Sequence, residues 1–167
     1  QAYYHFEANK DGNPPNNWTS FFRGPAWNYY ENLDAWALHL FSKKQMDLNW
    51  ENPDVRRDVI AMIKWWLDKG VDGFRLDVIN YISKKDGLPD GNDLIGQLMG
   101  FYGVEHYFYG PRLHEYLKEI KKEAFEPYDA FTVGETPGIG MEMGKLLTAG
   151  YRKELDMIFS FDHLETP

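Results

Sequence analysis

The chain has 167 residues, with 18 Lys and Arg against 26 Asp and Glu, which gives a net charge of −8 at neutral pH. It contains no cysteine, which excludes a disulfide scaffold, a cysteine-ligated zinc site and a thiol nucleophile. The acidic balance argues against a nucleic-acid partner, because neutralising phosphates requires clustered Lys and Arg. No run of about 18 apolar residues occurs, so the sequence also predicts no membrane span.

Residues 1–51 are predicted to form loops and short strands, because turn-forming residues and scattered Gly and Pro interrupt the apolar patterns. From residue 52 the pattern changes to that of a helix. Asn52 and Pro53 are typical of a helix start, apolar residues then recur at spacings of three and four, and Gly70 predicts the end of the helix.

The remaining predicted elements alternate between strand and helix. In chain order they are strand 71–79, turn-rich loop 83–110, helix 111–127, strand 130–135, helix 141–149 and strand 156–161. This alternation predicts parallel strands joined by helical crossovers, and therefore an α/β fold.

Charged residues stand at the carboxyl ends of the first two strands, where parallel α/β folds hold their working groups. Side chains alternate faces along a strand, so Arg75 and Asp77 share one face and Glu135 is the last of its set on the next strand. Strands that neighbour each other lie about 4.8 Å apart, which would bring Asp77 and Glu135 face to face. Carboxyl groups about 5–5.5 Å apart are the geometry of a retaining glycosidase.

The two carboxyl groups would need different pKa values for that chemistry. Arg75 beside Asp77 would keep that nucleophile ionised, whereas Glu135 would need a raised pKa to donate a proton. From the pattern alone, an Arg75–Asp77–Glu135 ion-pair network that merely seals the end of a barrel is an evenly matched alternative.

Three motifs resemble the α-amylase superfamily, family thirteen of the glycoside hydrolases. Gly73-Phe74-Arg75-Leu76-Asp77 is similar to its nucleophile strand, and Val133-Gly134-Glu135 is similar to its acid/base strand. Gln45-Met46-Asp47-Leu48-Asn49 resembles the motif near the end of a small domain inserted after barrel strand three, although the family usually has Pro where this chain has Met46. Three such motifs in this order are strongly specific.

Further runs narrow the resemblance to the oligo-1,6-glucosidase group, among them Asn16-Asn17-Trp18 and Gly110-Pro111-Arg112-Leu113. Val78, directly after the nucleophile position, is similar to members that prefer α-1,6 links. The resemblance implies release of terminal α-1,6-linked glucose from isomalto-oligosaccharides. Trehalose-6-phosphate hydrolases, which share the Asp77-Val78-Ile79-Asn80 run, and α-1,4-glucosidases are alternatives. A non-catalytic barrel subunit is a further alternative, although such relatives typically lack one or both carboxylates.

Site residues carry over from the family position by position. The resemblance implies that Asp77 is the nucleophile, Glu135 the acid/base and Arg75 the residue that orients the nucleophile. Further positions match residues that line the glucose subsite or lie near the leaving group, and they are Phe22 and Gln45 for the subsite and Val78 and Thr136 for the leaving group.

Other residues are expected to support this site. The resemblance implies that Asp47 is a structural partner within its motif. The aromatic content of 17% predicts either a Trp-rich core or a pocket with flat apolar walls, and Trp18, Phe22, Trp27 and Trp50 lie in the part of the chain that would wall a sugar pocket. No cofactor and no metal ligand is implied within this chain, because two carboxylates suffice for the reaction. A structural divalent ion occurs in some relatives on a loop that this sequence does not contain.

The resemblance assigns residues 1–51 to part of the inserted small domain and residues 52–167 to a partial TIM (β/α)8 barrel, about strands four to six. A complete barrel has eight strands and takes roughly 250 residues, so the expected partner is the remainder of the same barrel. The expected substrate is an oligosaccharide, and the branch implies a bacterial, cytoplasmic enzyme.

The 167-residue chain by itself is predicted to have little or no glucosidase activity. In the family, a motif after strand seven supplies the carboxylate that stabilises the transition state, and this sequence lacks it. The purified chain would be assayed on isomaltose and on a nitrophenyl α-glucoside. Robust turnover that disappears in Asp77→Asn would contradict this interpretation.

Overall fold

The computed structural model describes residues 2–159, and it divides into two compact units. The first unit contains residues 1–55 and 84–108, and the second contains residues 56–83 and the chain from residue 109 onward. The stretch 84–108 therefore belongs with the N-terminal residues and not with the parallel strands. The domain boundary expected between residues 51 and 52 stays a prediction.

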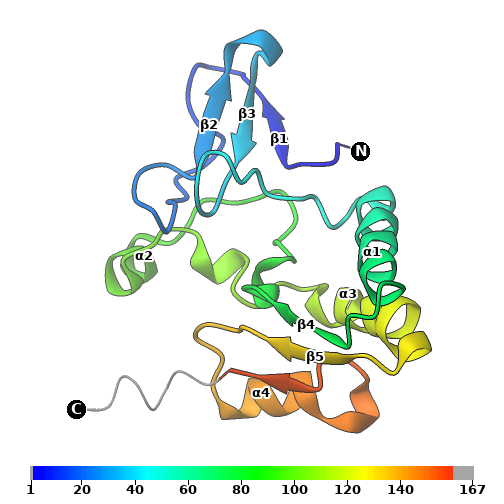
Figure 1. Cartoon of the computed structure of the whole chain (residues 1–167). Helices are drawn as coiled ribbons and strands as arrows, with labels where there is room; N and C mark the ends of the chain where they lie inside the picture. Colours follow the sequence, from blue (N-terminus) through cyan, green and yellow to red (C-terminus); the bar gives the residue numbers. More distant parts are fainter. Residues whose placement is uncertain (1, 160–167) are drawn as a thin grey trace. The chain divides into compact units, whose positions relative to one another are not determined.

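A small antiparallel sheet forms part of the first unit (Figure 1). Its strands pair in the order β1 (Phe6–Ala8), β3 (Ala35–Leu38) and β2 (Trp27–Tyr30). A turn at Glu31–Leu33 joins β2 to β3, and the next residue, Asp34, takes a left-handed conformation that closes it. The N-terminal part of the chain thus consists of short strands and loops, as its interrupted apolar pattern predicts.

Three tryptophans belong to the core of the first unit. Trp18, Trp27 and Trp50 are only 1%, 3% and 8% exposed, and Trp18 also stacks on the imidazole of His106. The expectation that these three side chains wall a sugar pocket is therefore wrong, because a buried ring leaves no face for a ligand. Of the four aromatic residues assigned to that wall, Phe22 alone is exposed, at 66%.

The prediction of an irregular loop over residues 83–110 is wrong in part, because this stretch contains helix α2 (Asp93–Met99). The side chain of Asn92 accepts two backbone N–H bonds of the first turn, at 2.9 and 3.2 Å, and Gly100 ends the helix in a left-handed conformation. Several apolar side chains of α2 are exposed, Leu98 at 77%, so the helix has no continuous buried face that a periodicity search would detect.

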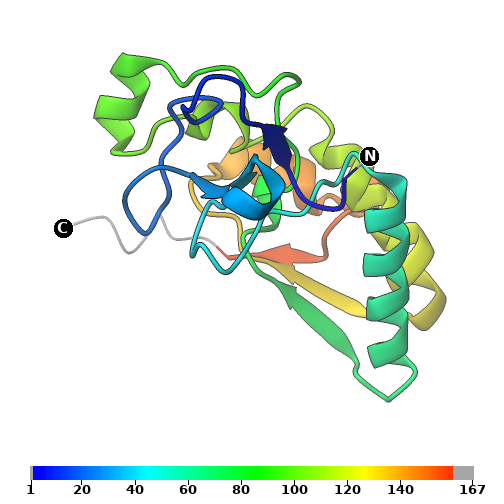
Figure 2. The ribbon, with the colours of Figure 1, turned by 90° about the horizontal axis from the view of Figure 1, so that it is seen from above.

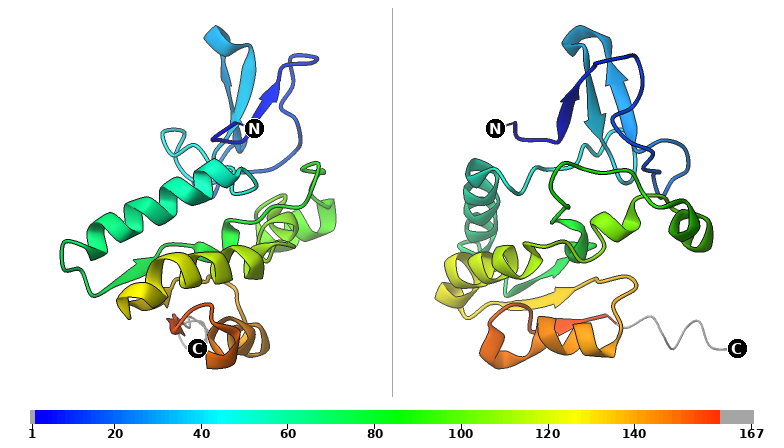
Figure 3. Two further views of the ribbon diagram at one scale, coloured as in Figure 1. Left: turned by 90° about the vertical axis from the view of Figure 1, so that its right-hand side faces the viewer. Right: turned by 180° about the vertical axis from the view of Figure 1, so that it is seen from behind.

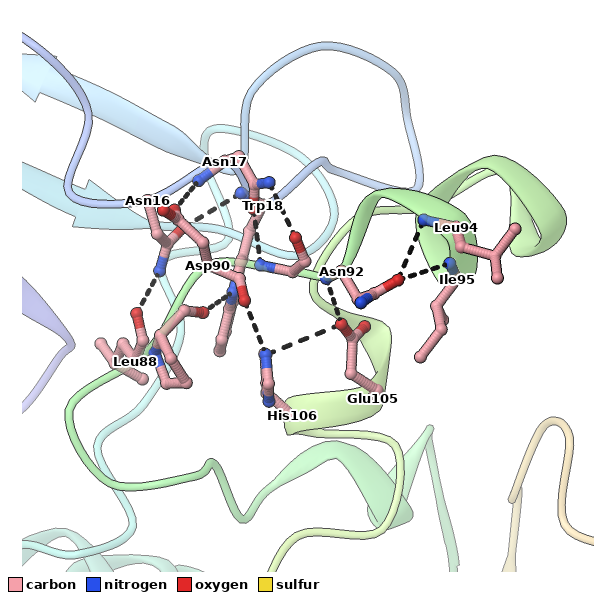
Figure 4. A network of polar contacts seen from close by, with 12 residues as sticks. Asn16, Asn17, Trp18, Leu88, Asp90, Asn92, Leu94, Ile95, Glu105 and His106 are labelled. Carbon is pink, nitrogen blue, oxygen red and sulfur yellow. Dashed lines mark hydrogen bonds and ion pairs between the residues drawn. The ribbon is translucent and has the colours of Figure 1, made fainter.

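A hydrogen-bond network connects the Asn16-Asn17-Trp18 motif to the loop before α2 (Figure 4). Asn17 exchanges two side-chain hydrogen bonds with the backbone of Gly91, at 3.0 and 2.7 Å. The indole nitrogen of Trp18 donates to the carbonyl oxygen of Pro89 at 2.8 Å. This motif therefore joins two segments that lie far apart in the sequence, which gives it a structural role within the first unit.

The second unit is built on a parallel sheet. Strands β4 (Gly73–Leu76), β5 (Phe131–Gly134) and β6 (Met157–Ile158) pair in that order, all in parallel. The predicted alternation of helices and strands is confirmed, although β4 and β5 are shorter than the predicted strands 71–79 and 130–135. Residues 160–161 of the third predicted strand lie outside the described residues. Parallel strands joined by helical crossovers are the repeating unit of a (β/α) barrel.

Helices alternate with these strands along the chain: α1 (Pro53–Leu67), α3 (Leu113–Ile120) and α4 (Met141–Thr148). Helices α1 and α3 lie side by side (Figures 2 and 3), and Arg56 pairs with Glu119 between them at 2.7 Å. The Phe74 ring on β4 contacts Phe125 at a centroid distance of 5.9 Å. The apolar face of β4 therefore packs toward the helices, as the alternation of its side chains predicts.

The chain after α3 departs from a regular helix. A π-helical turn, Lys121–Phe125, follows α3 directly, and a 3-10 turn at Glu126–Tyr128 contains Pro127, the last residue of the predicted helix 111–127. Lys121 donates to both carboxylate oxygens of Asp156 at 2.8 Å, and Asp156 in turn accepts hydrogen bonds from Thr132 on β5. This network ties the end of the helix to the start of two strands. Within residues 2–159, no helix is long and apolar enough to cross a membrane.

The stability of the first unit is predicted to fall as the pH falls from about 6.5 to about 4. Burial of His5 and the positive charge of Lys84 lower the pKa of His5 from 6.5 to about 4. The unfolded chain, with its ordinary His pKa, therefore binds more protons across this window, which destabilises the folded unit by up to about 3 kcal/mol. Hydrogen exchange of β1 in the full-length protein, measured across this pH range, reports the change.

The matched control is His5→Gln, which removes the titrating ring. Its free energy of opening, obtained after correction for the intrinsic pH dependence of amide exchange, should depend less steeply on pH over the same window, because no His5 proton is then taken up on unfolding. An identical pH dependence in both proteins would contradict the assignment to His5.

Candidate active site

The candidate site is formed where β4 and β5 end. Leu76 lies opposite Gly134 in the parallel register, and the backbone N–H of Glu135 donates to the carbonyl oxygen of Leu76 at 2.8 Å. The two following residues, Asp77 and Glu135, therefore leave the sheet next to each other. Their side chains fall on the same face as Arg75, because side chains alternate along each strand.

Arg75 bonds both carboxylates. Its Nη1 donates to Asp77 Oδ1 at 2.8 Å, and its Nη2 donates to Glu135 Oε2 at 2.7 Å. A guanidinium group suits this position because its planar fork presents several donors in fixed directions. The side chain of Glu135 is 20% exposed and that of Asp77 is 71% exposed, so the two carboxylates occupy different environments.

The pKa values of the two carboxyl groups shift in opposite directions. A hydrogen bond from the Glu135 carboxyl group, helped by the Arg75 guanidinium, lowers the pKa of Asp77. The same hydrogen bond to Asp77, together with burial, raises the pKa of Glu135. Of the two groups, Asp77 is therefore the stronger acid, and Glu135 holds its proton to a higher pH. Carboxyl groups whose surroundings move their pKa values apart can serve, one as an acid and the other as a nucleophile.

Two further predicted residues lie beside these carboxylates in the chain. Val78 has a left-handed backbone, with φ of 39°, which a β-branched residue rarely adopts. Thr136 is buried, at 2% exposure. Their expected places near a leaving group stay predictions.

The other two predicted site residues, Phe22 and Gln45, belong to the first unit. Phe22 is exposed, while the side-chain oxygen of Gln45 accepts the backbone N–H of Ser42 at 3.2 Å. Both stay predictions as lining residues of a glucose subsite. The structure thus brings Arg75, Asp77 and Glu135 together.

Asp47, which is expected to be a structural partner within its motif, forms a largely buried ion pair. Lys84, whose side chain is only 2% exposed, donates to the carboxylate of Asp47. The sequence could not single out Lys84, because a lysine that follows a strand ordinarily remains in solvent. Among residues 2–159, no group of three or more His, Cys, Asp or Glu side chains is arranged to hold a metal ion.

Two carboxyl groups on one arginine, at the ends of neighbouring parallel strands, are an arrangement typical of glycosidases built on (β/α) barrels. A family model, described as the alpha amylase catalytic domain, matches residues 1–167. The chain belongs to the α-amylase family.

Relatives of known structure or annotation agree with this assignment. The chain is 53% identical to an oligo-1,6-glucosidase of Parageobacillus thermoglucosidasius over 98% of its own length, and 50% identical to one of Halalkalibacterium halodurans over 97%. It spans 29% of the length of each of these curated relatives. The crystal structure of a trehalose-6-phosphate hydrolase of Bacillus licheniformis matches with a TM-score of 0.90 and 43% identity, over 98% of this chain and 28% of that one.

Replacing Arg75 by Met is predicted to raise the pKa of both Asp77 and Glu135. The positive charge of the guanidinium lowers the pKa of each carboxyl group, and its hydrogen bond further stabilises the ionised form of Asp77. Titration of the two carboxyl groups by carbon-13 NMR in the selectively labelled full-length protein measures both shifts.

The control for that titration is Arg57→Met, which removes an exposed arginine paired with its neighbour Asp58. It should leave the titration of both site carboxyl groups unchanged. Unaltered pKa values in the Arg75 variant would show that the guanidinium does not lower the pKa of either group.

Proposed function

We propose that the full-length protein carrying this sequence is a retaining α-glucosidase that removes terminal α-1,6-linked glucose from isomalto-oligosaccharides. The observation that carries the proposal is the pair of carboxylates, Asp77 and Glu135, bonded to Arg75 and shifted in opposite directions in pKa. The identity of about half of all positions with oligo-1,6-glucosidases supports the linkage.

The proposed reaction has two steps, each using both carboxyl groups. In the first, a carboxylate oxygen of Asp77 bonds to the anomeric carbon while the bond to the leaving oxygen breaks, and Glu135 gives that oxygen its proton. In the second, Glu135 takes a proton from water, which attacks the anomeric carbon and releases Asp77. Two inversions at one carbon retain its configuration.

The remaining residues are proposed to bind the substrate. Phe22 and Gln45 contact the terminal glucose, Val78 and Thr136 lie near the leaving group, and the remainder of the barrel completes the pocket. The reaction as proposed requires no cofactor, because the two carboxyl groups supply both the nucleophile and the proton. The bacterial sources of the relatives support a bacterial origin, and a cytoplasmic location is part of the proposal.

Trehalose-6-phosphate hydrolysis is the second candidate function. It is favoured by the close structural match to such a hydrolase. The Asp77-Val78-Ile79-Asn80 run also resembles that of trehalose-6-phosphate hydrolases. The same two carboxylates would perform the reaction, while a cationic site elsewhere in the protein would have to bind the phosphate. Conversely, the presence of both carboxylates argues against a non-catalytic barrel subunit.

Hydrolysis of isomaltose, maltose and trehalose 6-phosphate by the full-length protein tests the proposal. We expect the highest kcat/KM on isomaltose. Asp77→Asn and Glu135→Gln are each expected to lower kcat on the preferred substrate by at least about 100-fold, because each removes a group that acts on the reacting bond.

Trapping a covalent intermediate in the wild-type protein shows catalysis directly, without relying on variants whose loss of activity could come from loss of folding. A fluoro-glucoside should label Asp77 in the wild-type protein, and mass spectrometry of the peptide containing it should show the added sugar. Preference for trehalose 6-phosphate would favour the second candidate, and a folded full-length protein with neither turnover nor label would overturn the enzymatic assignment.

A further inference from the structure

The backbone after β4 holds Glu135 from three directions. The N–H of Glu135 donates to the Leu76 carbonyl oxygen at 2.8 Å, and its own carbonyl oxygen accepts the N–H of Ile79 at 3.1 Å. The Glu135 carboxyl group also accepts a hydrogen bond from the backbone N–H of Val78. The position of this side chain is therefore set by the conformation of the segment 76–79.

That conformation is not one that the sequence favours locally. Val78 has φ of 39° and ψ of 42°, and a left-handed backbone is unfavourable for a β-branched residue unless its surroundings impose it. It aims the N–H groups of Val78 and Ile79 at Glu135 together, much as successive N–H groups converge on an anion in a backbone nest. Some other part of the structure must hold this conformation in place.

The next residues supply that support. A buried 3-10 turn, Ile79–Tyr81, follows Val78, and the N–H of Tyr81 donates to the Val78 carbonyl oxygen at 3.0 Å. Asn80, at the centre of the turn, is 0% exposed, and its Nδ2 donates to the carbonyl oxygen of Pro137 at 3.3 Å. Asn80 thus connects the turn after the proposed nucleophile to the loop that carries the proposed proton donor.

Packing around this connection leaves little room for movement. A Cβ atom added to Gly134, the residue before Glu135, would lie 2.7 Å from Leu155 Cδ1 and 3.3 Å from Ile79 Cγ2. The chain on both sides of Glu135 is therefore fixed, at Gly134 by close packing and at Pro137 by the hydrogen bond from Asn80.

We propose that Asn80 is a positioning residue for the proton donor, acting through the Pro137 carbonyl group and through the left-handed backbone of Val78. The inference rests on the proposed function. It gives a role to Asn80, the residue of the Asp77-Val78-Ile79-Asn80 run that has no part in the proposed reaction steps. A proton donor must lie within hydrogen-bond reach of the leaving oxygen, so a small displacement of Glu135 slows the step it assists.

The experiment compares two substrates in the full-length protein. Isomaltose releases a sugar alkoxide that needs a proton from Glu135, whereas α-glucosyl fluoride releases fluoride, which needs little protonation. In Asn80→Asp, which keeps the side-chain volume but loses the donor to Pro137, kcat/KM is expected to fall about tenfold or more on isomaltose and less than about threefold on the fluoride. Asn80→Ser, which keeps a hydroxyl donor, should recover part of the loss.

The control is Thr132→Val, which removes a buried hydrogen bond to Asp156, 2.8 Å long, from the same strand that leads to Glu135. A purely structural defect reduces the amount of folded enzyme and lowers both rates in the same proportion. The ratio of the two rates should therefore be unchanged in Thr132→Val and altered in Asn80→Asp.

Each remaining outcome has a defined meaning. If the wild-type protein hydrolyses neither substrate, the proposed function fails. If the wild-type protein is active but the Asn80 variants keep its substrate ratio, the positioning role is overturned while the proposed function stands. If none of the Asn80 variants folds, the residue is a scaffold residue, and the positioning role is likewise overturned.

Discussion

Asp77 and Glu135 would repel each other if both were ionised, and Arg75 is the group that allows them to lie together. Its guanidinium bonds one oxygen of each carboxylate, at 2.8 and 2.7 Å. The hydrogen bond between the two carboxyl groups then lowers the pKa of Asp77 and raises that of Glu135. This arrangement depends on the parallel register of β4 and β5, because one residue of slippage would turn a carboxylate to the opposite face.

The backbone that follows β4 holds Glu135 in its place beside Arg75 and Asp77. The left-handed conformation of Val78 and the buried turn around Asn80 direct peptide groups toward Glu135. A locally unfavourable conformation beside a reactive pair is typical of functional sites, where the surrounding packing maintains it. In the first unit, the Lys84–Asp47 pair and the network around Trp18 likewise connect segments that are distant in the sequence.

Much of the second unit could be predicted from periodicity and end signals. The helix that begins at Pro53, the parallel strands and the shared face of Arg75 and Asp77 follow from residue spacing alone. Helix α2 could not be predicted in this way, because its apolar side chains are largely exposed. Trp18, Trp27 and Trp50 could not be placed from the sequence, because aromatic composition does not distinguish a ring that packs in a core from one that binds a sugar.

The sequence by itself determined the alternation of helices and strands, the pair of carboxylates at the strand ends and the α-amylase family motifs, because these depend on local spacing. Only the tertiary structure decided that one arginine bonds both carboxylates, that their pKa values move apart and that Asn80 reaches Pro137. Those features depend on strand register and on contacts between residues up to 60 positions apart. No local pattern encodes such contacts, because they form only when the separate strands and turns pack together.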